Sequence, residues 1–109
     1  MSVGRIMAHI SNAENYWFSH IKGVAVSGRI QDDEVGSIEF VKDRLNQVHQ
    51  CSWQMLEGFI ISDLGQTRHV GGTPYEIGWI IWHVIEHEIH HRGELSLILG
   101  LLGREGLDA

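Results

Sequence analysis

Residues 73–103, TPYEIGWIIWHVIEHEIHHRGELSLILGLLG, predict one long helix that the shorter segments of the chain pack around. Thr73 is a suitable N-cap, Pro74 lacks the amide that the first helical position leaves unused, and Glu76 completes a capping box. Gly103 supplies a helix stop.

A projection at about 100° per residue places a stripe of aliphatic side chains on one face of this helix. The stripe consists of Ile77, Ile80, Ile81, Val84, Leu95, Ile98, Leu99 and Leu102. Its middle, over about two turns of 3.6 residues, is occupied instead by His87, Glu88 and His91. Burying such groups without partners costs about 1–3 kcal/mol each. The pattern therefore predicts partners for them.

His87 and His91 are four residues apart, the spacing that offers two imidazoles to one metal ion. The alternative is a pair of hydrogen-bonded core histidines, and we favour the metal. His83 and His90 lie further round the helix and are interpreted as solvent-facing or outer residues, although either of them, or His20, remains open as a ligand.

Residues 2–21 predict the first helix, with Ser2 as N-cap. Its apolar stripe contains Val3, Ile6, Ile10, Ala13 and Trp17. His9 lies at the edge of this stripe. Because the long helix offers only two ligands, His9 is the candidate for the third.

The remaining segments predict one more helix and two loops. Residues 23–36 read as a solvated loop, residues 38–60 as a second helix with apolar residues at alternating three and four positions, and residues 61–72 as another loop. Cys51 is interpreted as a small buried side chain rather than a reactive thiol. No strand pattern is apparent, so the class is all-α, an up-and-down bundle with three main helices.

Composition limits the possible functions. With 109 residues and 43% hydrophobic residues, the chain predicts a single domain over residues 1–109. A formal charge of −6 with only 8 Lys and Arg disfavours nucleic-acid binding. A single cysteine, with no signal peptide and no long uncharged apolar run, predicts a cytoplasmic protein that does not enter membranes.

His87, Glu88 and His91 also fit the H-E-x-x-H pattern of zinc proteases. Metzincins continue this pattern with Gly and His, where this chain has Glu94 and Leu97. The short remaining tail leaves no room for a second lobe. A protease is therefore disfavoured.

Read as His-x-x-x-His-x-x-x-His-Arg-Gly, the same residues resemble the DinB/YfiT-like superfamily of metal-binding four-helix bundles. The resemblance extends over nearly all the chain. VGRIMAHISNAENYWF, residues 3–18, is similar to the family's helix with the first histidine ligand, and WHVIEHEIHHRGELSLILGLLG, residues 82–103, is similar to its last helix. Glu94 stands where the family commonly has Gln.

The resemblance implies a metal site formed by His9, His87 and His91, with open positions for water or substrate. Zinc or nickel is the expected ion, and a low-molecular-weight thiol is a candidate second cofactor. The implied activity is a thiol S-transferase or a hydrolase acting on a small molecule; the alternative is a non-enzymatic bundle that binds metal or a partner. Glu88 could act as a base or orient a ligand, so no catalytic residue is assigned.

A homodimer is expected because the family's helix before the first histidine is not found in this chain. The back of the long helix is also apolar, with bulky residues beside small ones. These residues are Trp79, Trp82, Ile89 and Leu97, with Gly93, Ser96 and Gly100. A second subunit would cover this face and complete the bundle.

Overall fold

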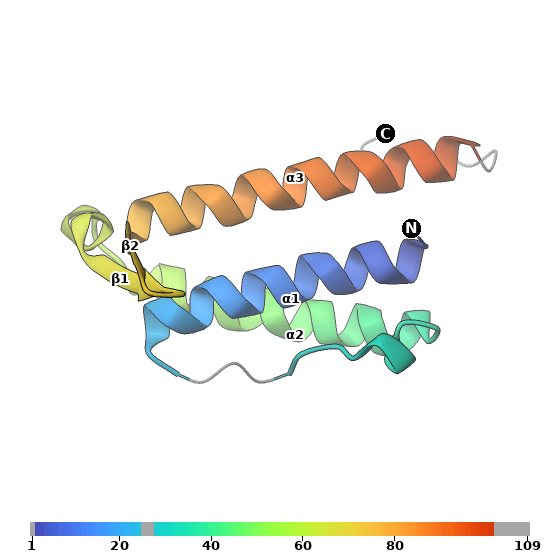
Figure 1. The fold of residues 1–109 in the computed structure, drawn as a ribbon, viewed down its shortest axis with the longest axis horizontal. Coiled ribbons are helices and arrows are strands. Elements are labelled where there is room, and N and C mark those ends of the chain that lie inside the picture. The colour runs from blue at the N-terminus through green and yellow to red at the C-terminus, as the bar shows by residue number, and fades with distance from the viewer. Residues whose placement is uncertain (1, 25–27, 102–109) are drawn as a thin grey trace.

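Three long helices dominate the computed structural model, which describes residues 2–24 and 28–101. They are α1 (Val3–Lys22), α2 (Ile38–Glu57) and α3 (Ile77–Leu101). Helix α1 packs against both α2 and α3 (Figure 1). The prediction of a mainly helical fold is confirmed, and none of the helices in the described ranges has the length and apolar character needed to span a bilayer.

The first two helices begin where the sequence predicts. Ser2 Oγ accepts a hydrogen bond from the Arg5 amide at 3.2 Å, and Ser37 Oγ accepts one from the Phe40 amide at 3.3 Å. Both serines satisfy amides that a helix start leaves free. Helix α2 ends at Glu57, three residues before the predicted end at residue 60.

The expectation of no strands is wrong. β1 (Thr67–Val70) and β2 (Thr73–Glu76) pair as an antiparallel hairpin. Gly71 and Gly72 connect them with φ of 59° and 83°. Two consecutive residues with positive φ suit a two-residue hairpin loop, whose twist matches that of the strands, and glycine adopts this conformation without steric cost.

The hairpin also overturns the predicted start of the long helix. Thr73 and Pro74 belong to β2, and α3 begins at Ile77, whose amide donates to the Gln66 carbonyl at 2.8 Å. Because Thr73 and Glu76 pair with β1, they do not form the predicted capping box at the start of the helix. The predicted stop at Gly103 lies outside the described residues.

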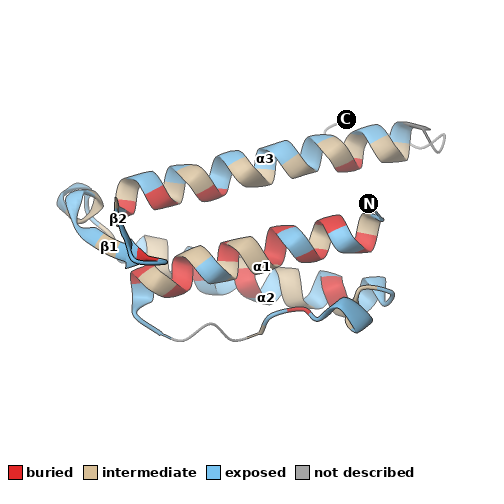
Figure 2. Ribbon diagram, in the orientation of Figure 1, coloured by how far each residue is buried: buried red, intermediate tan, exposed pale blue. Residues whose placement is uncertain are grey.

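Two apolar clusters join α1 to α3, one near each end of α1, and a third packs Ala8 of α1 against Ile30 and Val41. The cluster at the hairpin end comprises Phe18, Ile21, Val70, Ile77, Ile80 and Val84. The cluster at the other end comprises Ile6, Ile10 and Leu95. Buried positions of α1 and α3 face each other in Figure 2. The gap in the predicted stripe of α3 thus corresponds to a polar layer between two apolar clusters.

The segment before α2 is attached to α1 rather than fully solvated. The Asn12 side chain accepts from the Ile30 amide at 2.8 Å and donates to the Ile30 carbonyl at 3.0 Å. Ile30 is only 2% exposed. The predicted loops also contain two short 3₁₀ turns, Asp32–Glu34 and Ile61–Gly65.

Candidate metal centre

Three histidines from two helices meet in the polar layer. His9 comes from α1, and His87 and His91 lie one turn apart on α3. The Nε2 atom of His87 is 3.0 Å from Nε2 of His9 and 3.1 Å from Nε2 of His91. The structure therefore brings together the three residues that the sequence predicts as ligands.

Hydrogen bonds alone do not explain this convergence. A ring nitrogen has one in-plane position for a proton or a lone pair. Nε2 of His87 therefore cannot form good hydrogen bonds to both neighbouring Nε2 atoms. In a tetrahedral zinc site with Zn–N bonds of about 2.0–2.1 Å, the nitrogens lie roughly 3.4 Å apart. The observed spacing is close to that arrangement, so the three imidazoles fit a shared divalent cation.

The electrostatic environment favours the neutral forms of His87 and His9. Burial, followed by the nearby rings of His91 and His9, lowers the pKa of His87 to about 4. Burial and the proximity of His91 lower the pKa of His9, with a smaller opposing effect of Glu94. A metal ion binds the neutral imidazole, so both rings are ready for coordination at neutral pH.

Glu94 lies behind His91. One carboxylate oxygen is 2.5 Å from Nδ1 of His91, an ion-pair distance, although the alignment is not that of a hydrogen bond. A carboxylate that accepts a hydrogen bond from the far nitrogen of a ligating histidine would fix the ring orientation. The residue that replaces the family's common Gln therefore contacts the candidate site instead of facing only solvent.

The other histidines considered as ligands lie outside this group of three, although His90 forms a second group of possible donor atoms with His91 and Glu94. His83 stacks on Trp79 with ring centroids 4.7 Å apart and is 6.4 Å from the His87 ring. Nδ1 of His20 is 2.7 Å from the Tyr16 carbonyl. The His90 side chain is 72% exposed, with its nearest carboxylate at 3.6 Å. The structure does not bring these rings to the point where the three Nε2 atoms converge.

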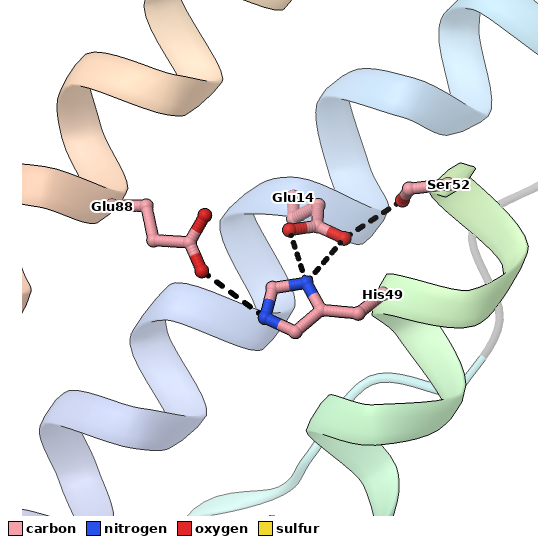
Figure 3. Close-up of polar contacts among 4 residues, drawn as sticks. All are labelled: Glu14, His49, Ser52 and Glu88. Atoms are coloured by element: carbon pink, nitrogen blue, oxygen red, sulfur yellow. Dashed lines mark hydrogen bonds and ion pairs between the residues drawn. The ribbon is translucent and has the colours of Figure 1, made fainter. Parts of the chain in front are cut away.

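A second polar cluster joins all three helices (Figure 3). Nδ1 of His49 lies 2.9 and 3.0 Å from the two carboxylate oxygens of Glu14, and Nε2 lies 3.1 Å from Glu88. Ser52 Oγ donates to Glu14 at 2.7 Å. Glu14 is only 4% exposed. We call Glu14, His49, Ser52 and Glu88 the His49 cluster.

His49 carries a positive charge in this cluster. Hydrogen bonds to Glu14 and Glu88 raise its pKa to about 10, and the hydrogen bond from His49 lowers the pKa of Glu88. The two carboxylates contact opposite ring nitrogens, which point in different directions and cannot both bind one ion. Although the donor atoms lie close together, the arrangement is that of an imidazolium bridging two carboxylates.

The sequence pattern does not reveal this cluster. It places Glu88 beside the metal site, but the ion-pair partner of Glu88 is His49 of α2. Glu14 lies four residues after Ile10 and four before Phe18, both of which are buried. That helical spacing is the one local signal for a buried Glu14. The pairing with His49 spans 35 residues and leaves no local pattern.

The expectation of a buried Cys51 is wrong, since its side chain is exposed. Cys51 directly precedes Ser52, which lies on the buried face of α2 and is 7% exposed. Adjacent helical residues point about 100° apart, so the two side chains face different directions.

A small cavity of about 190 Å³ lies beside His9. Arg5 from α1 and Arg29 and Asp32 from the attached segment contribute charged side chains to its lining. Its volume is below the range of about 300–1,000 Å³ typical of small-molecule sites, so it suits a small ionic group, and two arginines against one aspartate favour an anion. The candidate metal centre therefore adjoins a polar space able to hold part of a substrate.

Comparison with known proteins supports the resemblance seen in the sequence. The model of the DinB family matches residues 1–108, nearly the whole chain. The search of curated proteins found no match to the chain.

Proposed function

This chain belongs to the DinB family, and we propose that it binds one divalent metal ion through His9, His87 and His91 and uses it in a transfer or hydrolysis reaction on a small molecule. The observation that carries the proposal is the convergence of three Nε2 atoms at 3.0 and 3.1 Å. Zinc or nickel suits three neutral imidazoles.

The expected chemistry follows from the donor set. A divalent ion held by the three neutral imidazoles of His9, His87 and His91 would act as a Lewis acid toward a thiol or water. Glu94 lies against Nδ1 of His91, and the arginines beside His9 favour a substrate with an anionic group. A low-molecular-weight thiol that carries a carboxylate meets both requirements, so we propose a thiol S-transferase type of reaction.

Metal analysis tests the binding proposal. Protein purified without an affinity tag is expected to hold close to one metal ion per chain. His91→Ala removes a ligand and should weaken metal binding by more than about 100-fold. That is the largest loss of metal affinity usually caused by replacing a residue that only contacts a ligand. His69→Ala is the matched control, because His69 is exposed on β1, belongs to none of the possible donor groups, and its loss should leave metal affinity unchanged. Equal affinity in both variants would contradict the assignment.

An activity screen tests the reaction. Low-molecular-weight thiols are combined with electrophilic acceptors, and turnover is measured before and after metal removal with EDTA. We expect turnover that EDTA abolishes and that the metal restores. Intact metal binding without metal-dependent turnover on this panel would favour a bundle that binds metal or a partner without catalysis.

A further inference from the structure

A groove of about 740 Å³ lies between α2 and α3, with Glu14 and Phe18 of α1 among its lining residues. None of the three candidate metal ligands lines it. Glu88 lines the groove and directly follows His87, so the groove adjoins the metal-binding stretch of α3 without including the ligands, and the proposal below does not rest on a bound metal. Its volume falls within the range of about 300–1,000 Å³ typical of small-molecule sites.

The walls of this groove are largely apolar. Trp53 and Leu56 line the α2 side, and Ile81, Val84 and Ile85 line the α3 side. Trp53 is 66% exposed and Ile85 is 49% exposed. Both present apolar surface that a ligand could remove from water.

The charged groups of the groove are mainly acidic. Glu14, Glu57 and Glu88 contribute three carboxylates, against the single imidazolium of His49. Arg92 is a further cation that acts on Glu88, but it does not line the groove. Counting Arg92 together with His49 against the three carboxylates still gives a net charge of −1. The groove therefore attracts cations and repels anions.

We propose that this groove binds a small organic ammonium ion, a primary amine on an apolar aromatic or aliphatic body. The exposed Glu57 and half-buried Glu88 carboxylates accept hydrogen bonds from the ammonium group, and the apolar walls cover the body. Glu14 contributes charge only, because it is buried within the His49 cluster. The exposed Trp53 ring offers a face for a cation–π contact. A bare metal ion fits less well, because His49 already directs its two nitrogens at separate carboxylates (Figure 3).

Calorimetric titration of the full chain with three probes of similar shape tests the proposal. These are 2-phenylethylammonium, neutral 2-phenylethanol and anionic 3-phenylpropionate. The amine is expected to bind about tenfold more tightly than the alcohol. This is the gain in affinity expected from one charge-assisted hydrogen bond between the ammonium group and a carboxylate. The anion should bind more weakly than either.

Two variants with matched controls locate the binding. Ile85→Ser should weaken amine binding roughly tenfold by removing apolar wall, whereas Ile61→Ser, at a site 88% exposed outside the groove, should not. Glu57→Gln should weaken it roughly two- to fivefold. Glu39→Gln removes the same charge from α2 away from the groove and should have no effect.

Three results would overturn the proposal. One is equal affinity for the amine and the alcohol. Another is displacement of the amine by zinc, which would place it at the histidines. The third is no amine binding at millimolar concentration, including the case in which a second copy of the chain covers the groove.

Discussion

At the scale of single residues, His49 joins the three helices through its contacts with Glu14 of α1 and Glu88 of α3. Its pKa is raised from 6.5 to about 10, so the folded protein holds this proton more tightly than the unfolded chain does. The resulting stabilisation is complete below pH 6.5 and is lost as the pH rises toward 10.

This linkage predicts a pH-dependent effect of His49→Gln. The variant leaves Glu14 buried without its cation, so it should be less stable than the parent at pH 6 and pH 7. The difference in free energy of unfolding should narrow as the pH approaches 10, because the parent then loses its own charge. Urea unfolding of both proteins across this range provides the measurement, and a constant difference would contradict the prediction.

At the scale of elements, the segment before α2 is held on α1 at two points. One is the pair of hydrogen bonds between Asn12 and Ile30. The other is Gly4, where an added Cβ would clash with the Val35 carbonyl oxygen. This close approach positions the residues that line the cavity beside His9, including Val35.

Gly4→Ala should therefore displace this segment. The clash is with backbone, which cannot move aside as a flexible side chain does, and the expected loss of stability is about 1–3 kcal/mol. Gly36→Ala is a suitable control, since a Cβ there meets nothing within 4 Å and φ is not positive. Its effect should stay within about 0.5 kcal/mol. Similar urea unfolding curves for the two variants would exclude a tight contact at Gly4.

At the scale of the whole molecule, α3 exposes a broad apolar face. Trp82, Ile89 and Leu97 are 60%, 63% and 65% exposed, and Trp79 is 40% exposed. Contiguous apolar surface of this kind often marks an interface. We propose that a second copy covers this face in a two-fold homodimer.

Light scattering tests the dimer at micromolar concentration. The parent is expected at twice the chain mass of 12.3 kDa. The double variant Trp82→Gln, Leu97→Gln should shift it toward the monomer, whereas Ile61→Ser, also strongly exposed but in the turn after α2, should not. A monomeric parent would rule the dimer out.

Local sequence pattern is sufficient to predict the three helices and the inward-facing histidines. Both depend on local geometry, because residues three and four apart share a helix face whatever surrounds it. The periodicity of α3 thus places His87 and His91 together. The apolar face of α1 and the requirement for a third ligand favour His9, and the family resemblance selects it over His20.

The hairpin and the His49 cluster, in contrast, depend on tertiary contacts. Residues 73–76 satisfy the rules for a helix start, but pairing with β1 across Gly71 and Gly72 gives them a competing partner. Glu14 and His49 are 35 residues apart. Helical periodicity indicates which face each residue lies on, but the packing of α2 against α1 determines which side chains meet across the core.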